Sequence, residues 1–150
     1  MSLRIPPVIQ FFACALLAWG LTRLLPQLSL DSSVWIYAGY GFIAAGAIVL
    51  TLAVLAFMRA RTTVNPLSPE QAETLVTSGL YRFSRNPMYL AMALILIGGA
   101  LALGNIAALL APAVFVTIMT LFQIKPEERA LESNFGEAFT HYRRQTRRWL

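Results

Sequence analysis

The chain has 150 residues, of which 57% are hydrophobic and only 13% charged, and its net charge is +5. So much apolar side chain cannot be hidden inside one small soluble core, so the composition excludes an ordinary soluble domain and predicts that a lipid bilayer serves as part of the solvent. The basic residues flank hydrophobic segments and no groove-reading module is visible, which argues against a nucleic-acid partner and for anionic lipid headgroups. With Cys14 the only cysteine and His141 the only histidine, we expect no disulfide and no metal centre.

Apolar segments in chain order predict the membrane helices. A crossing needs about 20 mostly apolar residues, and the 35 residues from Leu90 to Ile124 contain no charge at all, which is enough for two crossings. Gly104-Asn105 is the expected break, because glycine and asparagine tolerate turn geometry. The sequence therefore predicts an all-α integral membrane fold with a tight hairpin between the last two of four transmembrane helices, at about 5–25, 33–58, 87–103 and 106–124.

The segments outside these spans are short, so we expect one domain over residues 1–150. Two prolines in Thr62–Pro69 predict an extended loop, followed by a short helix that ends at Gly79. The tail at 125–150 has helical spacing that places Leu131, Phe135, Phe139 and Tyr142 on one face, which predicts a cytoplasmic amphipathic helix.

Basic residues predict the orientation, because cytoplasmic loops hold Lys and Arg that are difficult to translocate. With the spans as predicted, Arg23 is the one basic residue on the far side; the other eleven precede the first span, separate the second and third, or follow the fourth. We therefore expect a multi-pass protein with both termini in the cytoplasm, in the inner membrane if the source is bacterial.

Several polar residues have simple structural explanations. Asn86 suits a helix N-cap and Pro87 the first helical position, so the pair can open the third span without any further role. Glu127 and Glu128 follow Pro126 in the first turn of the expected tail helix, where the helix dipole favours carboxylates. Each feature is weak by itself.

Together, however, these residues match a family pattern in order and spacing. The stretch TLVTSGLYRFSRNPMY resembles the signature of isoprenylcysteine carboxyl methyltransferases, in which a TLVTSG-type turn leads to R-H-P-x-Y at the start of a membrane helix. Downstream, EERALESNFGEAFTHY resembles that family's E-E-x-x-L-x-x-x-F-G-x-x-Y-x-x-Y region, with Phe139 in place of the first tyrosine. The resemblance covers roughly Asn65 to Leu150.

The resemblance implies a membrane enzyme that binds S-adenosyl-L-methionine without a Rossmann fold and methylates a lipid-like acceptor at the membrane boundary. No G-x-G-x-x-G motif follows a predicted strand, which agrees with this expectation. The implied catalytic residues are Glu127, Glu128 and Asn86, and the implied substrate contacts are Gln123 and Glu127. The implied cofactor contacts are Glu73, Thr74, Leu75, Val76, Tyr81, Asn86, Pro87, Met88 and Tyr89.

Two departures from the pattern leave the acceptor open. Asn86 stands where isoprenylcysteine enzymes carry histidine, and NPMY with paired glutamates is also similar to phosphatidylethanolamine N-methyltransferases. Gln123 stands where the isoprenylcysteine enzymes have an arginine, and an amide cannot bind an acceptor carboxylate as a guanidinium does. An amine acceptor would instead lose a proton to Glu127 or Glu128. A thiol acceptor, and a non-catalytic membrane scaffold or transporter subunit, are further alternatives.

Overall fold

The computed structural model describes residues 5–30, 32–59 and 75–150. Short helical turns accompany the main helices at η1 (Pro26–Leu28), η3 (Gly79–Arg82) and η4 (Ile106–Leu109). The main helical segments are α1 (Pro7–Leu24), α2 (Ser33–Arg59), α3 (Pro87–Ala102), α4 (Leu110–Ile118), the wide π-helical segment η5 (Met119–Ile124), α5 (Lys125–Phe135) and α6 (Glu137–Gln145). The loop predicted at 62–69 lies outside the described residues.

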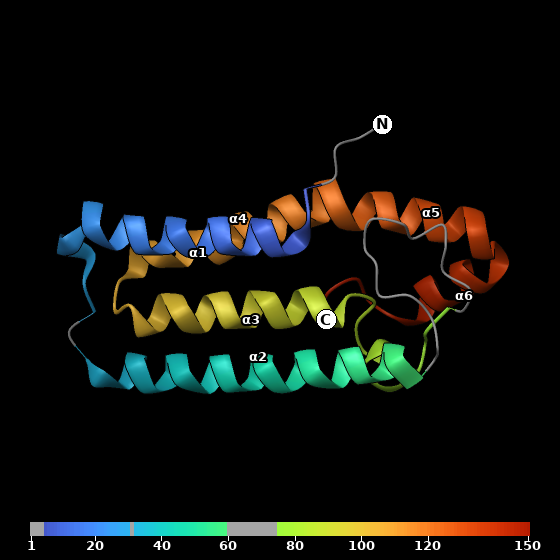
Figure 1. Ribbon diagram of the computed structural model, residues 1–150, viewed down its shortest axis with the longest axis horizontal. Coiled ribbons are helices and arrows are strands. Elements are labelled where there is room, and N and C mark those ends of the chain that lie inside the picture. Colours follow the sequence, from blue (N-terminus) through green and yellow to red (C-terminus); the bar gives the residue numbers. More distant parts are fainter. Residues whose placement is uncertain (1–4, 31, 60–74) are drawn as a thin grey trace.

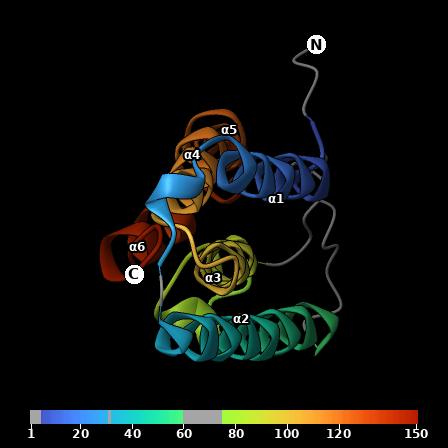
Figure 2. The ribbon, with the colours of Figure 1, turned by 90° about the vertical axis from the view of Figure 1, so that its left-hand side faces the viewer.

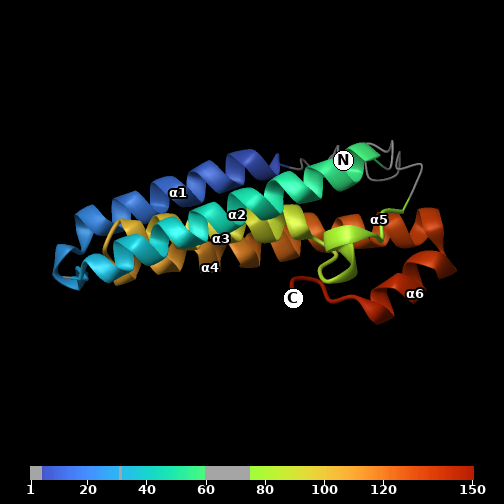
Figure 3. The same cartoon turned by 90° about the horizontal axis from the view of Figure 1, so that it is seen from below.

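The long helices form a bundle in which α3 is central. It lies between α2 on one side and α1 with α4 on the other (Figures 1 and 2). Successive helices run in opposite directions, so the end of α2, the start of α3 and the helices α5 and α6 gather at one end of the bundle (Figure 3). Segments far apart in the sequence are thereby brought together at that end.

Three helical segments of the described chain are long and apolar enough to cross a membrane: Pro7–Leu24, Ser33–Arg59 and Ile106–Phe135. The central helix α3 is apolar but has 16 residues. Large hydrophobic side chains such as Phe12, Tyr37 and Ile48 remain well exposed on the outer faces, which is unfavourable in water and favourable in lipid. The protein is therefore a multi-pass membrane protein.

Glycine allows α2 and α3 to approach closely. A Cβ atom added at Gly98 would lie 2.5 Å from the carbonyl oxygen of Gly39, and one added at Gly46 would lie 2.8 Å from that of Ala91. A Cβ at the neighbouring Gly99 would meet no atom within 4 Å. Small residues at such a seam let helix backbones pack by van der Waals contact where lipid gives no hydrophobic drive.

The predicted break between the third and fourth helices is confirmed. Gly104 has a φ of +62°, which favours glycine, and Asn105 accepts a hydrogen bond from the backbone N–H of Ala107. The Asn105 amide also donates to the carbonyl of Leu25 at 2.9 Å. The backbone N–H of Leu30 donates to the Gly104 carbonyl at 2.7 Å, so this turn is fastened to the connection that joins α1 to α2.

The helix does not break at Ile124, where the fourth span was predicted to end and the tail to begin, although the π-helical segment η5 gives way to α5 there. Helical structure continues from Ile106 to Phe135. Pro126 removes one backbone donor and crowds the preceding turn, and the wide η5 segment just before it gives the chain room. Glu127 and Glu128 lie in the first turn of α5, as predicted, but this turn continues the preceding helix and is not a separate helix N-terminus.

The tail is also not one helix. Gly136, with a φ of +53°, separates α5 from α6, which turns back toward α3 (Figure 1). Phe139 and Tyr142 are buried, and Leu131 and Phe135 pack against the same cluster, so the predicted apolar face is real although the helix bends.

The short helix expected to end at Gly79 is likewise not found in its described part. Residues 75–77 are not helical, and Gly79, with a φ of +62°, begins the η3 turn instead.

Candidate active site

Three predicted site residues meet between the start of α3 and the η5–α5 junction. The Tyr89 hydroxyl donates to Oε1 of Glu127 at 2.8 Å, and Nε2 of Gln123 donates to the same oxygen. Tyr89 and Gln123 are buried, while Glu127 is partly exposed. These residues, here called the Tyr89 cluster, place one carboxylate between an aromatic hydroxyl and an amide.

The neighbouring carboxylate has a different environment. Oε1 of Glu128 accepts from Nη2 of Arg85 at 2.8 Å and from Nε of Arg148 at 3.0 Å, and Oε2 accepts from Nη2 of Arg148 at 2.7 Å. The side chains of Arg85 and Glu128 are 9% and 12% exposed. Hydrogen bonds to Glu128 raise the pKa of Arg148. These three residues, here called the arginine clamp, occupy both oxygens of Glu128 with guanidinium groups.

The clamp holds the C-terminal end of the chain against the segment that precedes α3. The backbone N–H of Arg85 donates to the Arg147 carbonyl at 2.9 Å, and Nδ2 of Asn86 donates to the Arg148 carbonyl at 3.0 Å. Nη1 of Arg85 donates to the carbonyls of Arg143 and Thr146. Main-chain and side-chain contacts thus bind the chain end to the RNPMY motif.

These contacts correct the simple explanation for Asn86. It stands at the N-cap position with Pro87 first in the helix, but its side chain makes no capping hydrogen bond. The amide is turned to the Arg148 carbonyl instead. Asn86 therefore serves the contact between the motif and the chain end.

A second apolar cluster supports the motif from the α2 side. Tyr81 lies in edge contact with Phe57 of α2, with ring centroids 5.2 Å apart, and its carbonyl accepts from the Tyr142 hydroxyl at 2.6 Å. Val76 and Phe139 are buried in the same cluster. Burial raises the pKa of the Tyr142 phenol above its ordinary value, so this hydroxyl stays a proton donor.

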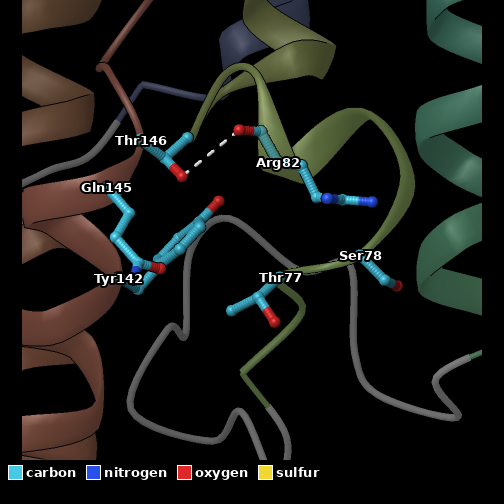
Figure 4. A pocket seen from close by; sticks show the side chains of 6 residues that line it. All are labelled: Thr77, Ser78, Arg82, Tyr142, Gln145 and Thr146. Atoms are coloured by element: carbon cyan, nitrogen blue, oxygen red, sulfur yellow. Dashed lines mark hydrogen bonds between the residues drawn. The ribbon is translucent and has the colours of Figure 1, made fainter.

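A cavity of about 420 Å³ opens beside this cluster (Figure 4). Thr77 lies across it from Tyr142 and Gln145 of α6, and Ser78 lines its far side; Oγ1 of Thr146 donates to the Arg82 carbonyl at its edge at 3.4 Å. The lining is mostly polar and comes from the motif and the tail: Thr77, Ser78, Arg82, Tyr142, Gln145 and Thr146. The two segments of the predicted signature therefore meet at this cavity too.

The sequence pattern of the phospholipid methyltransferase family matches residues 34–138, which is more than half of the chain. The chain belongs to the phospholipid methyltransferase family. The match includes Tyr89, Gln123, Glu127 and Glu128, so the family's pattern spans the helices that bring these residues together. The protein is thus a methyltransferase by family, and it acts in a membrane.

A protein of Haemophilus influenzae, described as uncharacterized, is 44% identical to this phospholipid methyltransferase family member over 63 residues. The similarity covers 42% of this chain and the whole of that relative. No solved structure matches the chain.

The predicted site residues of this family member fall into three groups in the structure, apart from Glu73 and Thr74, which lie outside the described residues. Hydrogen bonds join Tyr89, Gln123 and Glu127. Asn86 and Glu128 instead meet at Arg148. The remaining cofactor candidates belong to the signature stretch itself and are buried or partly buried: Leu75, Val76, Tyr81, Pro87 and Met88.

Sequence reasoning missed Arg85 and Arg148 as site residues, because positive-inside anchoring explained every arginine at this end. Arg85 precedes the Asn-Pro pair directly and its guanidinium is almost fully buried, which membrane-surface anchoring does not require. The position of Arg85 inside the RNPMY motif was the sequence feature that could have indicated its role. Trp149 makes a further contact that the sequence did not indicate, because its Nε1 donates to Oγ1 of Thr120 at 3.1 Å.

Proposed function

We propose that this protein is an S-adenosyl-L-methionine-dependent methyltransferase that acts on a lipid-like or prenylated acceptor, in the manner of isoprenylcysteine carboxyl methyltransferases. The observation that carries the proposal is the contact between Tyr89 and Glu127, 38 positions apart in the chain and both within the family match. The family indicates methyl transfer, and we propose the Tyr89 cluster as the site of that reaction.

The residues of the cluster fit the proposed cofactor. S-adenosyl-L-methionine carries a methyl group on a sulfonium cation, together with an adenine ring and an amino acid end. A carboxylate such as Glu127 attracts the cation, and an aromatic ring such as Tyr89 favours it further. The motif residues Leu75, Val76, Tyr81 and Met88 would give apolar contacts to the rest of the group.

Glu127 is the better candidate for proton transfer of the two glutamates. Both oxygens of Glu128 accept hydrogen bonds from arginine, which favours its ionised form and leaves it to position the chain end. Glu127 accepts hydrogen bonds from two neutral groups, the Tyr89 hydroxyl and the Gln123 amide, and it is partly exposed. We therefore assign Glu127 the role of base and Glu128 a positioning role, with Asn86 as its neighbour in that role.

The acceptor class depends on Gln123. Its amide is turned to Glu127 and cannot offer a carboxylate the paired donors of a guanidinium. An amine acceptor would lose its proton to Glu127 as the nitrogen takes the methyl group, so a phospholipid amine of the phosphatidylethanolamine type is the second candidate acceptor. A carboxylate acceptor would need no base, and Lys125 or Arg129 would have to hold it.

The proposed site lies at the cytoplasmic face of a single domain with four crossings. This arrangement follows from the positive-inside rule, because basic residues lie at the end of α2, just before the start of α3 and within α5 and α6, and these parts gather at one end of the bundle (Figure 3). An apolar acceptor would then enter between helices with its polar head at this end and its tail in lipid.

The test is to supply methyl-labelled S-adenosyl-L-methionine to the protein in vesicles made from a membrane lipid extract and to identify the labelled product. A base-labile methyl ester would support the isoprenylcysteine-like acceptor, and a stable methylated amine would support the phospholipid acceptor. Complete absence of labelled product would favour a non-catalytic membrane scaffold or transporter subunit.

The same assay tests the role of Glu127 as a base. With an amine acceptor, Glu127→Gln should lower the rate by about 100-fold or more, as expected for loss of a general base. Glu132→Gln is a matched control, because Glu132 lies on the same helix in an exposed ion pair with Arg143. Equal rates in both variants would show that Glu127 does not take part.

A further inference from the structure

A groove of about 620 Å³ lies between the last turns of α2 and the η3 turn. Its apolar wall includes Leu52, Leu55 and Phe83, and Phe83 is 70% exposed. Arg59 and Arg82 line its polar part. None of the described residues that line the groove is acidic.

The groove has an apolar part followed by a basic part, which matches the acyl chain and the phosphate of a phospholipid. Leu52 and Leu55 belong to a membrane-spanning segment, and Arg59 is the last residue of that segment. Arg82 extends its side chain toward α2 (Figure 4). An apolar wall that leads to two guanidinium groups at the membrane boundary complements an acyl chain that leads to a phosphate.

The turn that carries Arg82 is held firmly. The ring of Tyr81 packs against Phe57 of α2, and Tyr142 donates to the Tyr81 carbonyl. The backbone N–H of Ser84 also donates to the Leu80 carbonyl at 3.1 Å. Arg82 therefore faces the groove from a fixed turn, which lowers the entropy lost on binding.

We propose that this groove binds one anionic phospholipid, with the phosphate between Arg59 and Arg82 and an acyl chain along Leu52, Leu55 and Phe83. It is separate from the Tyr89 cluster, because α2 and α5 lie on opposite sides of α3 (Figures 1 and 2). The bound lipid fastens the η3 turn to α2 and is not the methyl acceptor. The inference does not rest on the proposed methyl transfer.

Native mass spectrometry of the full chain in detergent tests the proposal without any methyl donor. Phosphatidylglycerol and phosphatidylcholine with the same acyl chains serve as probes. We expect one phosphatidylglycerol to be retained in preference to phosphatidylcholine, and the Arg59→Gln/Arg82→Gln variant to bind it about tenfold more weakly or worse, as for a lost charge-assisted contact. The Arg59→Lys/Arg82→Lys variant keeps both charges and should keep the lipid preference.

The matched control is Arg144→Gln/Arg147→Gln, which removes the same charge from exposed residues outside the groove. This variant should bind phosphatidylglycerol like the unchanged protein. An equal loss in the control would mean diffuse attraction to a basic surface and would overturn the proposal. Equal retention of phosphatidylcholine, or full competition by glycerol phosphate at the same concentration, would also overturn it.

Discussion

The two ends of the helical bundle are held together by different forces. At the end that joins α1 to α2, the hydrogen bonds that fasten the Gly104-Asn105 turn among the described residues are neutral: Asn105 donates to the Leu25 carbonyl, and the backbone N–H of Leu30 donates to the Gly104 carbonyl. At the other end, a buried carboxylate binds two guanidinium groups, and a second carboxylate lies against Tyr89. At the first of these ends, here called the neutral end, main-chain hydrogen bonds and the Asn105 side-chain amide hold the Gly104-Asn105 turn in place. The other end is here called the charged end.

Buried charges are unfavourable unless they are fully paired, so a chain that only needed to close a bundle could have used neutral contacts at both ends. This protein keeps its buried ionic groups where the RNPMY motif, the η5–α5 junction and the chain end meet. We infer from this difference that the charged end is the functional one. Variants at the two ends test this inference.

The largest stability effect should come from Glu128→Gln. The change leaves the buried guanidinium of Arg85 and the partly buried one of Arg148 without their carboxylate, and breaking a buried pair lowers the free energy of unfolding by about 3 kcal/mol or more. Thermal unfolding of the variant and the unchanged protein in detergent measures this loss of stability. In contrast, Glu132→Gln breaks an exposed pair and should change it by about 1 kcal/mol or less. Similar losses in the two variants would contradict a special role for the arginine clamp.

An intermediate effect is expected at the seam between α2 and α3, which runs between the two ends. Gly98→Ala would bring a Cβ atom within 2.5 Å of the Gly39 carbonyl oxygen, and such overpacking lowers the free energy of unfolding by about 1 to 3 kcal/mol. Gly99→Ala meets no atom within 4 Å and should be neutral or slightly stabilising. If both variants unfold at the same temperature, the seam is looser than described.

The smallest effect should come from the neutral end. Asn105→Ala removes an N-cap, which lowers the free energy of unfolding by about 1 kcal/mol, and it should leave methyl transfer intact. Asn86→Ala removes no capping bond but frees the Arg148 carbonyl, so it should lower methyl transfer more than stability. Activity assays and unfolding of both variants check this contrast. A larger activity loss for Asn105→Ala than for Asn86→Ala would reverse the assignment of the two ends.

Sequence reasoning predicted the neutral end more fully than the charged end. The Gly104-Asn105 turn follows from local chemistry, and the predicted helix start at 33, also at this end, agrees with Ser33. Local chemistry failed for Glu127 and Glu128, which are adjacent in sequence but point to different partners on one helix. Those partners, Tyr89 and Arg148, lie far away in the chain, so only the fold could separate the two glutamates.

Two local signals were present but were given too little weight. Pro126 was read as the start of a new helix, although a widened turn can carry a proline within a continuous one. Gly136 was treated as part of a family motif, although its positive φ is what bends α6 back toward α3. The approach of the chain end to Arg85 involves backbone carbonyls, which no side-chain pattern could reveal.

We propose that the Tyr89 cluster at the charged end holds the methyl donor. Calorimetric titration of the purified protein with S-adenosylhomocysteine tests this proposal without any acceptor. We expect saturable binding that the Tyr89→Phe/Glu127→Gln variant weakens by about tenfold or more, while Glu132→Gln should bind like the unchanged protein. Absence of binding to the unchanged protein, or equal affinity in the double variant, would contradict it.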